Sequence, residues 1–313
     1  MGETRAVPSS ILGRPPPERT AMTLQSILQV LVSGLQVGCI YALMALSFYV
    51  IQSATGILNF AQGEWAMISA VLGVVFLPFV PYPIAIAAAI AGATSLAILS
   101  ERLFIRRLES MNASLVTVIL SLLGIMIVAR YGTALLFGQE EYPLPGPVRS
   151  EVIELGSELY LLPQTLVIYG ATVAVFAAVE LHMRRTKLGR SLRVAAIDPI
   201  GAQLIGVDLN RVRAFAFGLG GLIAAVAGWL YAPLYAAGYM IGVVPGVKGF
   251  IVMVIGGMAS PLGSLVGGIT LGLIEVAAAR YLSSLYSEAL AFVVLMGVLF
   301  VRPEGLIAAG TRS

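Results

Sequence analysis

The chain has 313 residues, of which 58% are hydrophobic and only 11% are charged, and its mean hydropathy is +0.94. Soluble domains carry about 25% charged residues, so this chain has too few ionisable groups to cover a water-facing surface. The composition excludes a soluble domain and a disordered chain. It predicts an all-α polytopic membrane protein.

The sequence offers little for catalysis or metal binding. Its one cysteine, Cys39, excludes a disulfide framework and a cysteine-based zinc site, and its one histidine, His182, argues against a catalytic triad. The chain has no G-x-x-x-x-G-K-[ST] phosphate loop, no H-E-x-x-H motif and no nucleophile elbow. We therefore expect no enzyme activity, no metal site, no cofactor and no nucleic-acid partner.

Apolar stretches divide the chain into about eight predicted spanning segments, because a membrane helix needs about 20 mostly apolar residues. The stretches cover 24–51, 56–80, 83–100, 115–137, 163–181, 212–237, 247–280 and 284–301. Ahead of them, residues 1–22 form a polar leader that we expect to be disordered. Residues 23–307 form a single transmembrane domain, followed by a short tail at 308–313.

The connections predict an orientation through the positive-inside rule. Connection 182–213 carries seven basic and two acidic residues, and 101–109 carries three arginines, so both are expected in the cytoplasm. Connection 138–163 carries five glutamates against one arginine and is expected outside. Eight simple crossings would then put both termini outside, despite the arginines near each end. Either both ends lie outside, or one segment in each half is re-entrant or split.

Two interrupted segments favour the second explanation. Residues 52–64 (QSATGILNFAQGE) place polar groups in the first apolar block, and residues 256–268 (GGMASPLGSLVGG) place a proline and five glycines in the seventh stretch. Non-helical backbone at membrane depth survives only where protein buries it or where it lines a cavity. Broken segments in corresponding positions of two halves point to a substrate path.

Ionisable residues inside apolar stretches are candidates for function because they are expensive in the membrane. Arg130, Glu180 and Arg280 lie close to segment ends, and we expect them to extend to the interface. Glu64 and Glu275 lie deeper, where they either fix the bundle by cross-helix hydrogen bonds or line the path. The candidate pathway residues are Asn59, Gln62, Glu64, Ser260 and Glu275.

Small residues in two segments predict close helix packing. Gly34 and Gly38 form one small-xxx-small frame, and Gly263, Gly267, Gly268 and Gly272 form two more. Missing side chains let helix backbones approach closely in lipid.

Connection 186–213 mixes charges with short apolar stretches. This pattern predicts short amphipathic helices interrupted near Pro199 and Gly206. An apolar face on a cytoplasmic connection indicates a docking partner, or alternatively a helix that lies on the bilayer surface.

Five stretches of the chain carry recognisable motifs. The first two are YALMAL at 41–46 and NFAQGE at 59–64. The third covers 188–199 in the cytoplasmic connection and continues to RV at 211–212. The last two are GGMASPLG at 256–263, which continues to Glu275, and VRPEGL at 301–306. Together they resemble the LivH-type permeases of branched-chain amino-acid ABC importers, in which the first three motifs read YALxALG, NFAHGE and LGRxxRAxAxDP.

The resemblance implies an importer with divided labour in the inner membrane of a bacterium. Such a permease pairs with a second homologous permease, two cytoplasmic ATPases that hydrolyse ATP and an extracytoplasmic substrate-binding protein, within membrane lipid. By resemblance, 188–212 is the loop that couples the permease to the ATPase. Its matching residues are Leu188, Gly189, Arg190, Arg193, Asp198, Pro199, Gly206 and Arg211.

Two departures from the family pattern bear on these expectations. Gln62 stands where the family commonly has histidine, which removes a group that would titrate near neutral pH. Arg106 and Arg107 replace the usual Arg-Pro, which predicts a longer helix after the third stretch. Because related permeases serve urea and short amides, these substrates stay open. From the residues alone, an ion-gradient-driven secondary transporter and an uncoupled channel or scaffold also stay open.

Overall fold

The computed structural model of the chain describes residues 24–111, 113–148, 153–154, 160–258, 260–282 and 284–307. The predicted leader (1–22) and tail (308–313) lie outside the described residues. Within the described part the chain is helical, apart from one two-stranded antiparallel sheet in which Ile153 pairs with Leu161. The all-α prediction is therefore confirmed.

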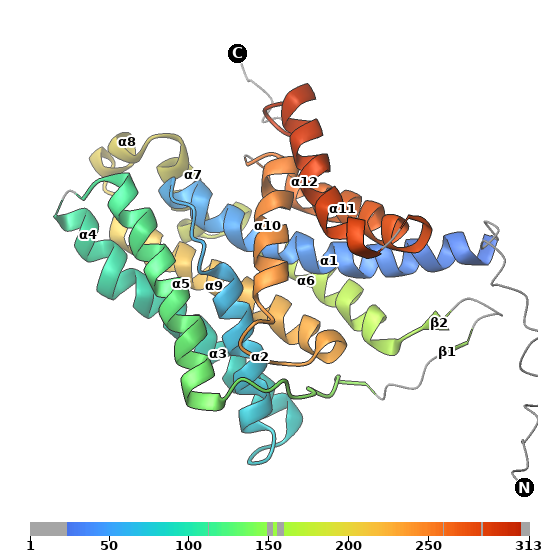
Figure 1. Cartoon of the computed structure of the whole chain (residues 1–313). Coiled ribbons are helices and arrows are strands. Elements are labelled where there is room, and N and C mark those ends of the chain that lie inside the picture. The colour runs from blue at the N-terminus through green and yellow to red at the C-terminus, as the bar shows by residue number, and fades with distance from the viewer. Residues whose placement is uncertain are drawn as a thin grey trace, which may run out of the picture.

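The elements follow one another along the chain as Figure 1 shows. The first part contains α1 (Leu24–Thr55), α2 (Gln62–Phe76), α3 (Tyr82–Ser100), a π-helical turn η2 (Glu101–Ile105), α4 (Arg106–Ser110) and α5 (Leu115–Phe137). The middle part contains β1 (Ile153–Glu154), β2 (Tyr160–Leu161), α6 (Pro163–Arg185), α7 (Lys187–Ile197) and α8 (Pro199–Leu204). The last part contains α9 (Leu209–Tyr235), α10 (Val243–Gly256), α11 (Pro261–Tyr281) and α12 (Ser284–Val301).

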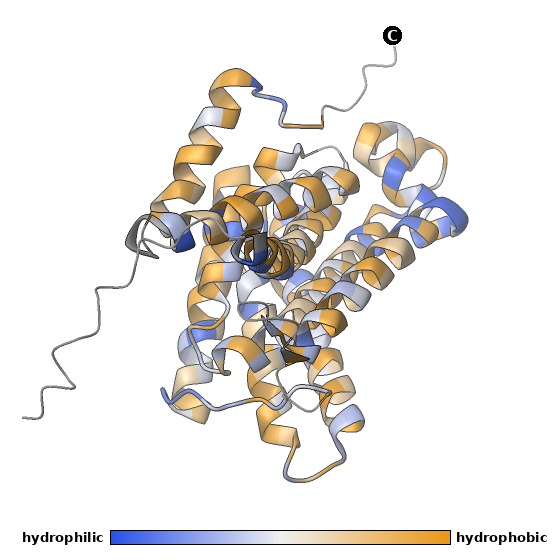
Figure 2. Ribbon diagram, turned by 90° about the vertical axis from the view of Figure 1, so that its right-hand side faces the viewer, coloured by the Kyte–Doolittle hydropathy of each residue, from blue (hydrophilic) through white to orange (hydrophobic). Residues whose placement is uncertain are grey.

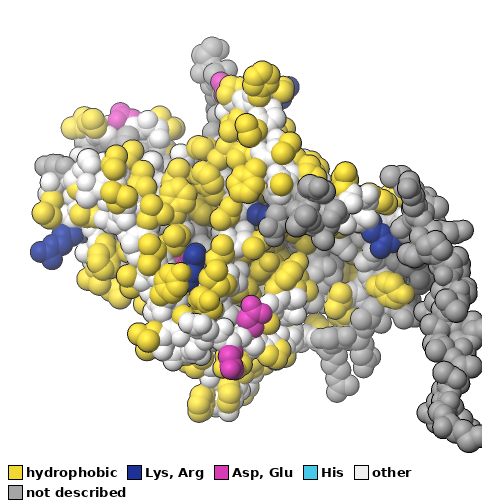
Figure 3. Space-filling view, in the orientation of Figure 1, with side chains coloured by type: hydrophobic (Ala, Val, Ile, Leu, Met, Phe, Trp, Pro, Cys, Tyr) yellow, Lys and Arg dark blue, Asp and Glu magenta, His cyan; other side chains and the backbone are white. Residues whose placement is uncertain are grey.

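Six helices in the described residues are long and apolar enough to cross a membrane. They cover Gln25–Thr55, Tyr82–Ser110, Leu115–Phe137, Pro163–Arg185, Leu209–Tyr235 and Pro261–Tyr281. Hydrophobic residues dominate the helical ribbons (Figure 2) and are spread over the described face seen in Figure 3, where few charged side chains appear. The third predicted stretch is lengthened to Ser110 through the π-helical turn, as the two arginines in place of Arg-Pro predict.

Two predicted stretches differ from the structure. The second stretch yields only the 15-residue helix α2, because the chain leaves the helix of α1 after Thr55 and resumes at Gln62. The seventh stretch is two helices, α10 and α11. Its helix stops at Gly257, which has φ +97°, and restarts with Pro261, whose fixed φ suits a first helical turn. Both interruptions fall inside the segments that the polar and glycine-rich patterns indicate.

The bundle consists of two halves with the same order of elements. Each half has a long helix (α1 or α9), a non-helical crossing (56–61 or 236–242), a half-length helix (α2 or α10) and two further helices. The contacts mirror one another: α1 packs on α10 and α11, while α9 packs on α2 and α3, and α1 packs directly on α9. Each long helix therefore packs mainly against helices of the other half.

The two long helices run antiparallel. The last turn of α1 and the first turn of α9 line the same cavity. At their other ends both helices bond to the start of α6, where Thr165 donates to Gln36 of α1 (2.8 Å) and Gln164 donates to the carbonyl of Leu230 in α9 (3.2 Å). The second half is therefore inverted relative to the first.

Glycines form the seam between α1 and α11. The small-residue frames predict close packing of both helices, and the structure shows that they pack on each other. A Cβ atom on Gly38 would lie 2.8 Å from the Gly268 carbonyl oxygen, and one on Gly272 would lie 2.5 Å from the Gly34 carbonyl oxygen. No larger residue fits at this spacing, so the backbones themselves are in contact. The apolar core lies where α1, α2 and α9 meet, whereas α5 lies at the edge with most of its surface exposed.

Candidate functional site

The crossing between α1 and α2 buries three of the predicted pathway residues. Asn59 and Gln62 are 0% exposed, and Glu64 is 1% exposed. The side chain of Asn59 accepts a hydrogen bond from the Ala61 N–H (3.1 Å), a local turn that leads the chain into α2. Gln62 donates from Nε2 to the carbonyl of Ser47 in α1 (3.1 Å), which ties the crossing to the long helix.

The half-length helices α2 and α10 meet near their N-termini. A Cβ atom on Gly63 would lie 2.4 Å from the Gly242 carbonyl oxygen, and neither helix has a side-chain cap. Helix N-termini carry partial positive charge and unpaired N–H groups. Within the described residues, Asn59 Nδ2 and Gln62 Oε1 have no hydrogen-bond partner. The crossing therefore offers buried polar atoms beside two helix N-termini.

Arg130 does not lie at an interface, and the prediction that it extends to the membrane edge is wrong. It lies within α5 and pairs with Glu64 of α2, with 3.1 Å between Arg130 Nε and Glu64 Oε1 and a second contact through Nη2. A buried unpaired charge would be expensive, and the pair lowers that penalty, although Glu64 Oε2 has no partner in the described residues. The partner comes from a helix 66 positions earlier, which no local pattern around Arg130 reveals.

Glu275 belongs to a second buried cluster. Its Oε1 pairs with Lys248 Nζ of α10 and accepts a hydrogen bond from the Tyr41 hydroxyl of α1 (3.3 Å). Lys248 Nζ also lies 5.6 Å from the centre of the Tyr41 ring, within range of a cation–π contact. The sequence analysis missed Lys248, although it is the only charged residue in 243–256 and an intramembrane charge is itself a signal.

Ser260 lies apart from Glu275. It directly precedes α11, and Glu275 follows 15 positions later on the same helix, about 22 Å along the axis at 1.5 Å per residue. The five predicted pathway residues thus occupy three places: the α1–α2 crossing, the Lys248 cluster and the start of α11.

Connection 186–213 folds as short helices, as its mixed pattern predicts. Thr186 caps α7 by accepting from the Gly189 N–H (3.0 Å), and Asp198 caps α8 by accepting from the Ile200 N–H (3.0 Å). Pro199 starts α8, and Gly206 ends the segment with φ +84°. The predicted interruptions near Pro199 and Gly206 are confirmed.

This pair of helices has an inner and an outer apolar face. Leu192, Ala195 and Ala202 are buried, and Arg193 donates from Nη2 to the Met183 carbonyl (2.7 Å), which fixes α7 on the end of α6. The outer face leaves four large aliphatic side chains between 72% and 86% exposed. They are Ile197, Ile200, Leu204 and Ile205.

The remaining predicted loop residues have distinct positions. Gly189 packs against α6, where a Cβ atom would lie 2.4 Å from the His182 carbonyl oxygen. Leu188 and Arg190 are exposed, and Arg211 pairs with Asp208 at 3.0 Å.

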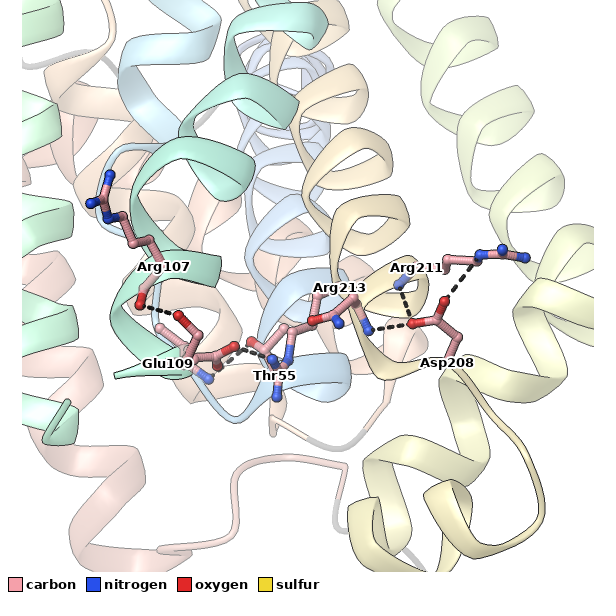
Figure 4. Close-up of polar contacts among 9 residues, drawn as sticks. Thr55, Arg107, Glu109, Asp208, Arg211 and Arg213 are labelled. Carbon is pink, nitrogen blue, oxygen red and sulfur yellow. Dashed lines mark hydrogen bonds and ion pairs between the residues drawn. The ribbon is translucent and has the colours of Figure 1, made fainter. Parts of the chain in front are cut away.

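The base of the loop is tied to α4. Arg213 of α9 reaches Glu109 of α4 beside Thr55, the last residue of α1 (Figure 4). Both charged side chains are about three-quarters buried, at 24% and 21% exposure. A cavity of about 570 Å³ adjoins this contact, between the end of α1, α7 and the start of α9. A displacement of α7 would therefore reach α1, α4 and α9 through direct contacts.

Comparisons with known proteins identify the family of the chain. A family model described as "Branched-chain amino acid transport system / permease component" matches residues 30–300. The high-affinity branched-chain amino acid transport system permease protein LivH of Salmonella typhimurium is 29% identical over 294 residues, which cover 90% of this chain and 95% of LivH. BraD of Pseudomonas aeruginosa, a permease protein with the same description, is 30% identical with the same coverage. The solved structure of PsaBC from Streptococcus pneumoniae in complex with Fab matches with a TM-score of 0.48 at 9% identity, covering 88% of this chain and 92% of that chain, a likeness too distant to inform the site.

Proposed function

The chain belongs to the family of permease components of branched-chain amino acid transport systems, and we propose that it carries branched-chain or related apolar amino acids into the cytoplasm by alternating access. It is a non-catalytic, multi-pass membrane subunit of an ABC transporter, so energy comes from an ATPase and substrate from a binding protein. In this proposal, 23–307 form one permease domain, which assembles with a second homologous permease and two ATPases.

The α1–α2 crossing is the proposed substrate path. The observation that carries this proposal is a pair of buried, unpartnered amide atoms, Asn59 Nδ2 in the non-helical segment and Gln62 Oε1 at the start of α2, beside the N-termini of two half-length helices. Irregular backbone inside a membrane bundle is stable only where it is enclosed or lines a path. Amide groups can exchange transient hydrogen bonds with a passing substrate without holding it tightly, as conduction requires.

The α7–α8 pair is the proposed coupling element. Its outer face exposes Ile197, Ile200 and Leu204 on a basic connection, and a contiguous exposed apolar face indicates a docking partner. An ATPase groove would bury this face, and the Arg213–Glu109 contact would pass its motion to α4. The alternative is a helix pair lying on the bilayer surface.

The exposed isoleucines distinguish the two alternatives for α7–α8. We expect Ile200→Glu to lower copurification of the ATPase with the permease at least 10-fold, because a carboxylate would be buried in the groove. The matched variant Arg190→Glu changes an exposed side chain on α7 and controls for charge. Unchanged copurification with Ile200→Glu would favour the bilayer surface.

Uptake into proteoliposomes tests the transport proposal. The permease, its partner permease, the ATPases and the binding protein are reconstituted, and uptake of labelled leucine and labelled urea is measured with and without ATP and with an ionophore. The proposal predicts leucine uptake that needs ATP and is insensitive to the ionophore. Preferential urea uptake would shift the substrate to short amides, and uptake that ignores ATP but collapses with the ionophore would contradict the energy source.

A further inference from the structure

The Lys248–Glu275 pair is a buried ion pair with spare bonding capacity. The side chains are only 7% and 15% exposed. Glu275 uses one oxygen, Oε1, for both Lys248 and the Tyr41 hydroxyl, while Oε2 has no partner within the described part of the chain. Lys248 carries three N–H donors, of which the described contacts use one. Each end of the pair can therefore accept another charged group.

A purely structural role does not account for this pair. Two buried charges lose several kcal/mol of hydration each, which they recover only when their remaining atoms are hydrogen-bonded. Here α11 is already held against α1 by the glycine seam of Gly38 and Gly268. The Glu64–Arg130 pair also leaves one carboxylate oxygen, Glu64 Oε2, without a partner in the described residues. It differs from the Lys248–Glu275 pair in that its arginine lies on the peripheral helix α5 and makes two contacts, both to Glu64 Oε1.

Aromatic side chains surround the pair. Tyr41 lies against both charged groups, and Tyr231 and Tyr235 of α9 stack with 4.3 Å between ring centres, within electrostatic range of Glu275. Tyr41 and Tyr231 are buried, whereas Tyr235 is 51% exposed at the last residue of α9. Of these three tyrosines, Tyr235 alone is largely exposed.

We propose that Lys248 and Glu275 form the site that recognises the two charges of an amino-acid substrate. Lys248 pairs with the substrate carboxylate, Glu275 pairs with its ammonium group, and the tyrosine rings contact the apolar side chain. The ion pair opens when substrate enters and closes behind it, so each buried charge stays neutralised throughout. Urea and short amides lack both charges and cannot open the pair. This inference rests on the proposed amino-acid transport.

Three variants in the assembled transporter test the inference. Lys248→Gln and Glu275→Gln each leave one charge unpaired, whereas Lys248→Met/Glu275→Met leaves no buried charge and can fold as well as the parent. The matched control, Glu180→Gln, neutralises an exposed glutamate of α6 that pairs with Arg184. Leucine uptake and ATPase activity stimulated by the loaded binding protein are measured for complexes shown to be intact by size-exclusion chromatography.

We expect the double variant to assemble, to keep stimulated ATPase activity within about twofold of the parent, and to lose leucine uptake at least 10-fold. Both single variants should lose uptake to a similar extent, and Glu180→Gln should match the parent. Leucine uptake at the parental rate by the double variant would overturn the inference and reduce the pair to a packing contact. If the parent itself transports urea but not leucine, the proposed function fails instead, which is a separate result.

Discussion

The two halves of the bundle share one order of helices but bury different charges. In the first half, the half-length helix α2 contributes a carboxylate, Glu64, to an arginine on α5. In the second half, the half-length helix α10 contributes an ammonium group, Lys248, to a glutamate on α11. The charge on the half-length helix thus has opposite sign in the two halves. Its partner lies on the last helix of the first half but on the third helix of the second half. The shared order of helices therefore does not dictate where charge is placed.

The crossings differ in the same way. The first crossing and the start of α2 carry the buried amides of Asn59 and Gln62, whereas the second crossing leads into α10 through Gly242. Gly63 of α2 and Gly242 bring the two places into backbone contact. At this point the first half contributes polar side chains, and the second half contributes a glycine, which has no side chain.

The largest effect is expected from adding side chains to glycines at tight contacts between the two halves. A Cβ atom on Gly228 of α9 would lie 2.0 Å from the Ala66 carbonyl oxygen, and one on Gly249 of α10 would lie 2.5 Å from Met44 Cβ. We expect Gly228→Val and Gly249→Val to abolish recovery of monodisperse protein in detergent. Gly170→Ala, where nothing lies within 4 Å, is the control. Normal recovery of either valine variant would mean that the two contacts between the halves are not equally tight.

The second-largest effect is expected at the Glu64–Arg130 ion pair. Arg130→Met leaves Glu64 buried without a partner, and we expect a loss of about 3–5 kcal/mol in the free energy of unfolding. Glu64→Met in the same chain should restore most of this loss, because no buried charge remains. Thermal unfolding in detergent measures both variants. A single variant as stable as the parent would show that water already reaches Glu64.

A smaller effect is expected in the connection that joins the halves. Asp198→Lys removes the cap of α8, which is worth about 1 kcal/mol, and Gly206→Arg strains a residue with φ +84°. We expect both variants to reach the membrane but to lose the coupling between ATP hydrolysis and uptake. Stimulated ATPase activity and uptake at parental levels in both variants would contradict a coupling role.

The smallest effect is expected at the surface of α6, outside both halves. Glu180 and Arg184 form an exposed ion pair one turn apart, and such pairs contribute about 0–1 kcal/mol. Glu180→Gln should change the midpoint of thermal unfolding by no more than about 1–2 °C, consistent with that contribution. A larger shift would indicate that this pair lies in an interface with another subunit.

Much of the fold could be predicted from the sequence because its signals are local. Apolar length predicted most of the long helices, the glycine frames predicted close packing of α1 and α11, and Pro199 and Gly206 predicted the ends of the loop helices. The proline and glycines of 256–268 located the break between α10 and α11.

The ion pairs could not be predicted in this way. Arg130 and Glu64 are 66 positions apart in the sequence, and Lys248 and Glu275 are 27 positions apart. Which residues pair depends on which helices pack together. The periodicity along a single helix does not carry this information. The inversion of the second half is hidden for the same reason, because its evidence is a set of contacts between helices rather than a repeated motif.

The antiparallel arrangement of α1 and α9 has an energetic consequence. If the two halves were identical in sequence, exchanging their conformations would give the same structure turned over in the membrane, with the same free energy. A preference for one side therefore comes from what breaks this equivalence: α6 and the connection outside the halves, the partner subunits, and positions where the halves differ, such as Glu64 and Lys248. In the proposed alternating-access cycle, we expect substitutions at these two positions to shift the balance between the two access states.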